Sequence, residues 1–231
     1  MNTFNELVVE CPTAAEQKSA TPILAPVQRK AISPASLLHD EQIHALIQQL
    51  FFGHEAAAVR HVGFAPMETS TSIATLCLEI ATALAEEDRY DVGLIDACLD
   101  SPLLQMQLQI PSPNRAETTW LIAPRLWMVP RQSWLPDASA AARITDQNLS
   151  RLRELTAEFD FSILYCAPVS WITASICQAC DGLVLVLTAN KTRRLVAAQI
   201  KDQLAKARVP LLGTVLAERR FPVPQGLYQN L

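Results

Sequence analysis

Short apolar runs alternate with longer helical patterns along most of this chain. Strands are expected at residues 59–64, 91–96, 126–129, 161–166, 182–188 and 210–216, and helices at 36–52, 72–86, 144–158, 171–179 and 192–208. Apolar strands separated by helices pair in parallel through right-handed crossovers, and the helices then cover both faces of the sheet. The alternation therefore predicts an α/β fold with a doubly wound, mostly parallel sheet. Ligands of such sheets bind at the carboxyl ends of the strands.

The composition favours one folded domain behind a flexible lead-in. Half of the 231 residues are hydrophobic and 18% are charged, whereas four prolines interrupt residues 1–36. We expect the domain to span residues 37–231. The net charge of −4 argues against a nucleic-acid-binding protein. Because no apolar run approaches the ~18 residues of a membrane span and the N-terminus lacks a signal pattern, we expect a cytoplasmic location.

The segment between the first expected strand and the next helix stands where a phosphate-binding loop would lie. Residues 62–75 contain no glycine after Gly63 and no lysine, and no lysine occurs between Lys30 and Lys191. A phosphate loop needs glycines whose backbone N–H groups surround the phosphates, and a lysine that reaches the terminal oxygens. The chain therefore has the arrangement of a nucleotide-binding protein without its phosphate-binding groups.

Other polar groups along the chain have simpler structural interpretations. The hydroxyl-rich run 69–72 is interpreted as a helix cap in preference to an anion site. The basic cluster at 191–194 is interpreted as a solvated face, with contact to a polyanion or to anionic lipid left open. No chemistry is assigned to the four histidines and no metal site is expected, because the spacing of a ligand set or triad is missing; they are His39, His44, His54 and His61.

The cysteines lie mostly within apolar segments, which is typical of buried free thiols in a reducing compartment. Cys177 and Cys180 form a C-x-x-C pair near the end of the expected helix 171–179. A structural role is favoured for this pair, because no second pair and no suitably spaced histidine accompanies it. A redox pair or half of a metal site remains the alternative.

Six segments carry a resemblance to a known family. They are EQIHALIQQLFF (41–52), DVGLIDACLDSP (91–102), FDFSILYCAPV (159–169), DGLVLVLTANKTRR (181–194), LGTVL (212–216) and RFPVPQGLY (220–228). In this order and spacing they resemble the P-loop ATPases of the MinD/ParA superfamily. More closely, they resemble the bacterial tyrosine kinases (BY-kinases) of capsule and exopolysaccharide synthesis. The resemblance covers about residues 36–231.

The resemblance implies that the phosphate loop of the family is degenerate in this chain. The family's G-K-S-T falls on four residues, Ser72, Ile73, Ala74 and Thr75. Ile73 thus takes the lysine position and Ala74 the position of the hydroxyl that ligates Mg²⁺, with Thr75 beside it as a substitute. A shift of about three residues, onto 69–72, also supplies neither glycine nor lysine.

The two acidic motifs of the family are also altered. Asp96 is kept, either as a vestigial or structural residue, which we favour, or as a catalytic one. The next aspartate, which in the family helps to hold Mg²⁺ and to activate the acceptor hydroxyl, is Cys98, and the following arginine is Asp100. The metal-linked aspartate of the third motif is Tyr165. Because phosphoryl transfer depends on positioning and electrostatic stabilisation, these replacements predict its loss.

Two further groups bear on association with partners. In the family's E-x-x-R-x-x-R helix, which mediates self-association, only Glu41 is kept, and the arginines fall on His44 and Ile47. A homo-oligomer is therefore left open. Three tryptophans in the proline-broken stretch after residue 97 are expected to be either core residues or partner anchors, namely Trp120, Trp127 and Trp134. The C-terminal tyrosine cluster of such kinases is reduced to Tyr228.

These features predict a pseudo-ATPase or pseudokinase without a cofactor. By resemblance, it would regulate or assemble an exopolysaccharide or capsule system through contact with a membrane chain-length regulator or a related kinase. It would meet the inner face of the membrane only through that partner. The first alternative is a divergent but active tyrosine kinase that uses ATP and Mg²⁺, with the missing lysine supplied from elsewhere. The second is a MinD-like positioning protein.

Overall fold

The computed structural model describes residues 40–53, 58–68, 72–87, 89–99, 103–110, 119–136, 144–188 and 194–217. The expected lead-in at residues 1–36 lies outside these ranges, as do Tyr228 and residues 69–71 of the expected phosphate loop. Among the described residues, no helix is both long and apolar enough to cross a lipid bilayer.

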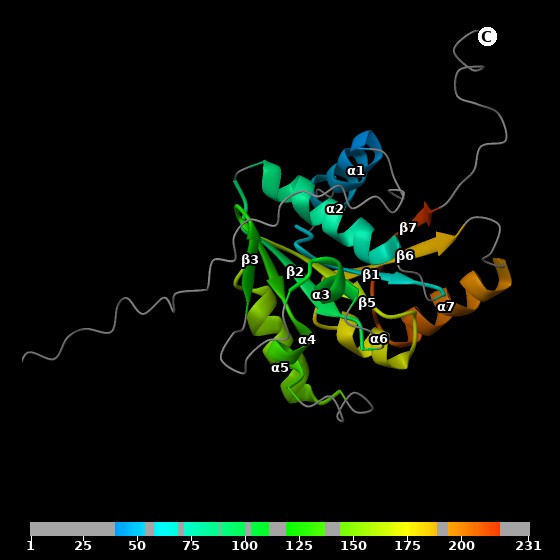
Figure 1. Ribbon diagram of the computed structural model, residues 1–231. Coiled ribbons are helices and arrows are strands. Elements are labelled where there is room, and N and C mark those ends of the chain that lie inside the picture. Colours follow the sequence, from blue (N-terminus) through cyan, green and yellow to red (C-terminus); the bar gives the residue numbers. More distant parts are fainter. Residues whose placement is uncertain are drawn as a thin grey trace, which may run out of the picture.

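Seven strands form a sheet in the order β3-β4-β2-β5-β1-β6-β7 (Figure 1). Their bounds are β1 His61–Pro66, β2 Val92–Ala97, β3 Trp120–Ala123, β4 Leu126–Val129, β5 Phe161–Cys166, β6 Gly182–Thr188 and β7 Leu211–Ala217. All neighbouring strands are parallel except β3 and β4, which pair antiparallel. The predicted doubly wound, mostly parallel α/β sheet is confirmed.

Helices cover both faces of the sheet (Figure 1). On one face, α1 (Asp40–Ile47) runs into a π-helical segment, η1 (Gln48–Phe52), and packs beside α2 (Ser72–Glu86). The other face is covered by α5 (Asp146–Thr156), α6 (Trp171–Cys177) and α7 (Arg194–Lys206). Two short helices, α3 (Leu103–Gln107) and α4 (Arg131–Trp134), follow β2 and β4.

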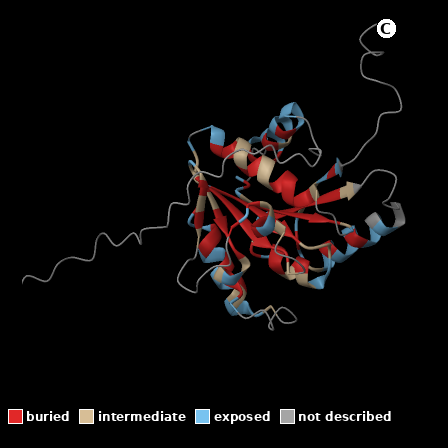
Figure 2. Ribbon diagram, viewed as in Figure 1, coloured by how far each residue is buried: buried red, intermediate tan, exposed pale blue. Residues whose placement is uncertain are grey.

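The two faces of the sheet belong to two separate hydrophobic cores. Successive strand residues point to opposite faces, and β5 shows the alternation. Ile163 and Tyr165 join the core under α1 and α2, whereas Leu164 and Cys166 join the core under α5, α6 and α7. The strands are accordingly buried along most of their length (Figure 2).

The strongly periodic segments were predicted well, and the proline-broken stretch was not. Strands at 126–129, 161–166 and 182–188 and the helix at 72–86 agree with the structure to the residue. The prediction of an irregular stretch before residue 126 was wrong, because α3 and β3 lie in it. Both elements are only four or five residues long and lie among the prolines at 102, 111, 113 and 124, which led to the prediction of an irregular stretch.

Candidate functional site

The candidate site lies where β1, β2 and β5 reach the carboxyl edge of the sheet. β5 lies between the other two strands, and α2 begins after β1 at Ser72. Asp96 on β2 is the register partner of Tyr165 on β5, so their side chains stand next to each other on the face that α2 covers. The fold thus brings together the residues that the resemblance assigns to the nucleotide pocket.

The first turn of α2 places apolar side chains in the core at this edge. Ile73 at the lysine position is 2% exposed and Ala74 is 1% exposed, while Ser72 is half-buried. Ile73 and Ala74 belong to the same hydrophobic core as Cys98 and Tyr165. The residues that the resemblance assigns to the family's lysine and to two of its metal-linked aspartates are therefore buried side chains of one apolar cluster.

Thr75, the substitute for the Mg²⁺-ligating hydroxyl, is engaged with a neighbouring helix. Its hydroxyl oxygen accepts a hydrogen bond of 3.0 Å from the Gln107 side-chain amide on α3. Thr75 is itself 7% exposed. The sequence pattern did not indicate this contact, because α3 was not predicted.

Asp96 is the one acidic group of the pocket that is kept, and it is buried at 1% exposure. Its Oδ1 accepts a hydrogen bond of 3.1 Å from the backbone N–H of Cys98, whereas Oδ2 has no hydrogen-bond partner among the described residues. Burial raises the pKa of Asp96 to about 7, and the Cys98 N–H and the charge of Arg131 oppose that shift. Near neutral pH, this carboxyl is therefore expected to be substantially protonated.

Arg131, at the start of α4, is a cation near this carboxyl that the sequence analysis missed. Its guanidinium donates to the carbonyl oxygens of Leu99 at 2.7 Å and of Cys98 at 3.4 Å, and so holds the segment that leaves β2. The indole N–H of Trp134 donates to the Asp96 carbonyl oxygen at 3.1 Å. The one sequence feature that could have indicated Arg131 as a site residue is its position shortly after the apolar strand 126–129. These contacts favour a structural role for α4.

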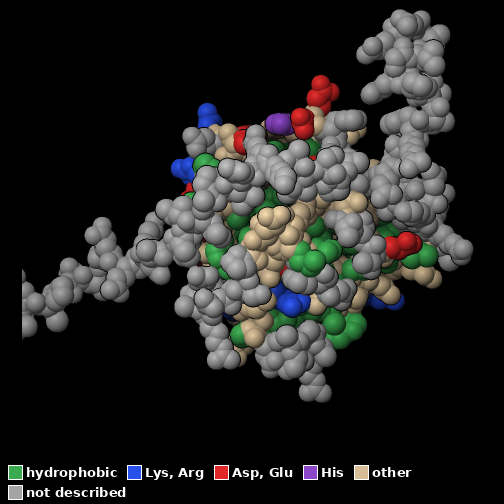
Figure 3. All heavy atoms as spheres, in the orientation of Figure 1, with side chains coloured by type: hydrophobic (Ala, Val, Ile, Leu, Met, Phe, Trp, Pro, Cys, Tyr) green, Lys and Arg blue, Asp and Glu red, His purple; other side chains and the backbone are tan. Residues whose placement is uncertain are grey.

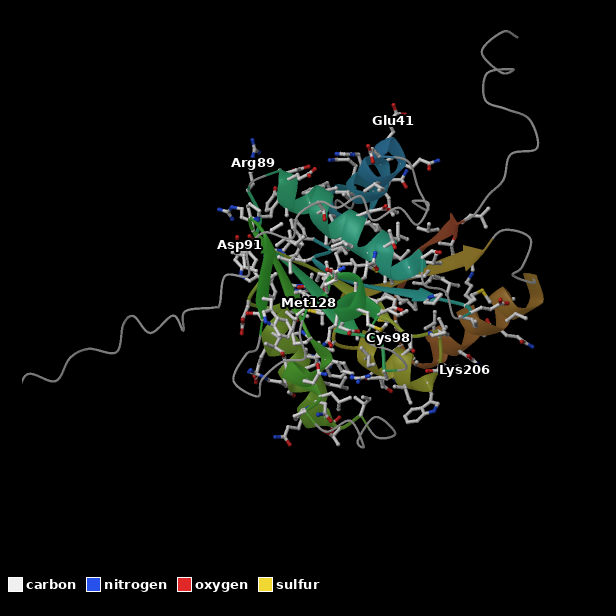
Figure 4. All side chains as sticks on the ribbon, viewed as in Figure 1. Glu41, Arg89, Asp91, Cys98, Met128 and Lys206 are labelled. Carbon is white, nitrogen blue, oxygen red and sulfur yellow. The ribbon has the colours of Figure 1, made fainter. Side chains whose placement is uncertain are left out.

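Cys98 and Tyr165 stand where the resemblance places two carboxylates of the family. Each is 3% exposed. Burial raises the pKa of Tyr165 far above its ordinary value, and a hydrogen bond with the Cys98 side chain adds to the shift. Among the described residues, no group of three or more His, Cys, Asp or Glu side chains is arranged to hold a metal ion. In Figure 4, Cys98 lies inside the ribbon, whereas Glu41 points outward from α1.

The structure divides the residues considered for partner contact into exposed and buried ones. On α1, Glu41 and His44 are exposed and Ile47 is 2% exposed. Of the three tryptophans, Trp120 and Trp134 are core residues at 1% and 0% exposure. Trp127 is half-buried, with its ring 5.9 Å from that of Phe159. The core alternative therefore applies to Trp120 and Trp134, and burial places Ile47 away from the surface.

The described surface also exposes apolar side chains that the sequence analysis did not select. Met106 on α3 and Trp171 at the start of α6 are each 66% exposed. Hydrophobic side chains reach the surface in separate patches on the face shown in Figure 3. Both residues follow strands at the carboxyl edge, β2 and β5 respectively, so this edge has apolar groups available for contact.

No family profile and no curated protein sequence matches this chain. Solved structures are similar to it in fold. The chimerical protein CapA2B2 has a TM-score of 0.67 at 16% identity, over 87% of this chain and 96% of that one. The kinase domain of the Escherichia coli tyrosine kinase ETK has a TM-score of 0.65 at 15% identity, over 80% and 79%.

A ParA family ATPase from Chlorobium tepidum is similar over 69% of this chain and 74% of its own, with a TM-score of 0.56 at 17% identity. The chimerical protein, the tyrosine kinase domain and the ParA family ATPase thus share one architecture with this chain. The fold is that of the BY-kinase and ParA-like P-loop proteins.

Proposed function

We propose that this protein is a non-catalytic regulatory or assembly subunit of bacterial exopolysaccharide or capsule production, acting by protein–protein contact. One observation carries the proposal. Ile73, Cys98 and Tyr165, which the resemblance assigns to the positions of a phosphate-binding lysine and two metal-linked aspartates, are all buried in one apolar core. A nucleotide would find packed side chains where it needs cations and metal ligands.

The physics of phosphoryl transfer explains why these replacements matter. The reaction requires little covalent chemistry from the protein, so the rate depends on positioning and on neutralising phosphate charge. Buried isoleucine, cysteine and protonated tyrosine side chains neutralise no charge. Asp96 in its ionised form would repel a nucleotide unless a metal ion lay between them.

The proposed partner is a membrane polysaccharide chain-length regulator or a related kinase, as the resemblance implies. Such a partner would hold the protein at the inner face of the membrane, and neither nucleic acid nor direct membrane contact is part of the proposal. Trp171 and Met106 are suited to such contact because exposed tryptophan and methionine side chains are common anchors. Homo-oligomerisation through Glu41 and His44 on α1 is a further proposal.

One observation favours a second candidate function, a divergent kinase that still binds ATP. Asp96 is retained at the carboxyl end of β2, and its Oδ2 is unpaired among the described residues. A carboxylate oxygen at this edge is a suitable Mg²⁺ ligand. The missing cation would then have to come from another part of the chain or from a partner.

Nucleotide binding distinguishes the two functions. We expect no heat of binding by calorimetry and no change in Tm with millimolar ATP or ADP and Mg²⁺, whereas an active BY-kinase domain serves as the positive control. Saturable binding that is lost in Asp96→Asn would overturn the proposal and support the divergent kinase.

The non-catalytic role makes a separate prediction in the host. Loss of the protein should alter the amount or chain length of exported polysaccharide, and expression of Asp96→Asn should restore it as well as the wild type. Failure of a stably folded Asp96→Asn to restore the polymer would show that the carboxyl takes part in the function.

A further inference from the structure

Three cysteine side chains gather on the face of the sheet that α5, α6 and α7 cover. Cys166 ends β5, Cys177 ends α6, and Cys180 lies in the turn before β6. The sulfurs of Cys177 and Cys166 lie 3.1 Å and 3.6 Å from the point that a Cβ atom on Gly63 would occupy. The Cys166 thiol donates a long hydrogen bond of 3.7 Å to the Leu164 carbonyl oxygen, and interaction with the neighbouring Cys177 thiol, together with burial, raises its pKa. Their sulfurs are therefore close neighbours in the core.

Cys180 is the partly buried member of this group of cysteines. Of the five described cysteines, Cys180 alone is not fully buried. Its backbone N–H donates to the Cys177 carbonyl oxygen at 3.1 Å, so the two residues lie at opposite ends of one tight turn. The guanidinium of Arg153 on α5 reaches the same turn, donating to the Gln178 carbonyl oxygen at 3.2 Å.

The charged side chains of Asp181 and Arg153 shift the pKa of Cys180 in opposite directions. Burial raises the pKa of this thiol and the charge of Asp181 adds to the shift, whereas the positive charge of Arg153 opposes it. Arg153 is thus the group that favours the reactive thiolate form. Since the shift is upward, oxidation should be slow at neutral pH and should accelerate as the pH rises.

We infer that Cys180, Cys177 and Cys166 form a thiol relay, in which Cys180 is oxidised first and a disulfide between Cys177 and Cys166 is the final product. The three cysteines lie on the sheet face that α5, α6 and α7 cover. The relay does not depend on the proposed function. Formation of the disulfide would join the carboxyl end of β5 to the last residue of α6.

The relay proceeds in three balanced steps with a hydroperoxide as the oxidant. The Cys180 thiolate attacks the peroxide, takes one oxygen as sulfenic acid and releases an alcohol, or water if the oxidant is hydrogen peroxide. Cys177 gives up its proton and attacks the Cys180 sulfur, which releases water and forms a disulfide. Cys166 then gives up its proton and attacks the Cys177 sulfur, and Cys180 leaves as a thiolate. Two thiols are oxidised and one peroxide is reduced.

The last step is favoured by the position of Cys166. The Cys166–Cys177 pair joins two regular elements, β5 and α6, whereas Cys177 and Cys180 lie at the two ends of one tight turn. Disulfides that distort a short turn are strained and easily reduced. A soft metal ion is a weaker explanation, because no described group of three ligands is arranged for one.

The test is to map disulfides in the full chain after oxidation. Protein carrying Cys11→Ser, which removes a cysteine outside the described residues, is treated with hydrogen peroxide, alkylated and digested without reductant. Mass spectrometry should identify a peptide pair linked through Cys166 and Cys177, while Cys77 and Cys98 remain alkylated. Cys180→Ser should slow formation of this disulfide about tenfold, because the buried pair loses its entry thiol.

A matched pair of arginine variants on α5 tests the entry step. Arg153→Gln should slow the oxidation of Cys180 about threefold, whereas Arg151→Gln should not change it, since Arg151 is paired with Glu154 on the exposed side of the helix. Circular dichroism of each variant shows that it is folded. Three results would each overturn the relay: a final Cys177–Cys180 disulfide, equal rates in wild type and Cys180→Ser, or unreacted Cys166 and Cys177 in the folded wild type.

Discussion

Carboxylates at the two edges of the sheet differ in their hydrogen bonding. At the amino edge, Asp181 Oδ2 accepts hydrogen bonds from the backbone N–H groups of Arg60 at 2.7 Å and His61 at 2.8 Å. Asp160 Oδ2 accepts from the N–H of Asp91 at 2.8 Å. At the carboxyl edge, Asp96 has one such bond and an unpaired oxygen among the described residues.

Exposure separates the two edges as well. Asp181 and Asp160 are exposed, so water can solvate their remaining lone pairs, and the side chain of Asp91 pairs with Arg125 at 2.6 Å. The amino edge has its own exception in His61, whose Nδ1 is buried without a partner among the described residues. The carboxylates of the amino edge hold strand ends together, whereas Asp96 sits in an apolar core that gives its charge little support. The two edges therefore differ in how well their carboxylates are solvated and hydrogen-bonded.

The largest expected effect comes from putting a cation back at the carboxyl edge. Ile73→Lys should lower the free energy of unfolding by about 4 kcal/mol, because it buries an ammonium group in an apolar cluster. Urea unfolding measures the change, and Ile73→Met, which keeps volume and polarity, should cost less than about 1.5 kcal/mol. A stable Ile73→Lys protein that binds ATP would mean that the edge is an open nucleotide site.

The second prediction concerns the pH dependence caused by Asp96. The pKa of its carboxyl is about 7 in the folded protein and about 3.9 in the unfolded chain, so folding is favoured by the protonated form. The stability contributed by this group is therefore present below about pH 4 and is lost as the pH rises through 7.

Asp96→Asn should remove this loss of stability at high pH, because an amide does not ionise. The variant should be more stable than the wild type by about 3 kcal/mol at pH 8, and the difference should shrink towards pH 5. Urea unfolding between pH 5 and pH 8 measures it. An equal destabilisation at every pH would contradict the prediction, because it would point to a charged and well-paired Asp96.

The smallest effect is expected at the amino edge, with the opposite sign. Asp181→Ala should destabilise the protein by about 1.5 kcal/mol, because two backbone N–H groups lose a charged acceptor and water compensates only in part. Asp202→Ala, which removes an exposed carboxylate from α7, should stay within about 0.5 kcal/mol of the wild type. If Asp181→Ala and Asp202→Ala had the same Tm, the hydrogen bonds of Asp181 would contribute no measurable stability, and the contrast between the two edges would be wrong.

The sequence predicted those parts of the fold that have a long periodic pattern. The helix at 72–86 and the strands at 161–166 and 182–188 were correct, and their alternation was sufficient for the sheet type. The hairpin strand β3 was missed because it is short and lies in a stretch broken by prolines at 111, 113 and 124. The order of the strands was not predicted, since it depends on how each crossover packs.

For the candidate site, the sequence supplied the residue types and the structure supplied their surroundings. The absence of a lysine at Ile73 is a fact of the sequence. That Ile73, Cys98 and Tyr165 share one core is a tertiary result. Arg131 and Gln107 were missed because they lie on short helices whose contacts join residues more than thirty positions apart.

The sequence by itself determined the class of the fold and the absence of lysine between Lys30 and Lys191, because periodicity and residue type are local properties. Only the tertiary structure decided which tryptophans are buried, which oxygen of Asp96 has no hydrogen-bond partner among the described residues, and that Cys166 lies near Cys177. These properties depend on distances between segments that the chain brings together by folding. The physical reason is that burial and desolvation belong to the packed core, where neighbours in space are seldom neighbours in sequence.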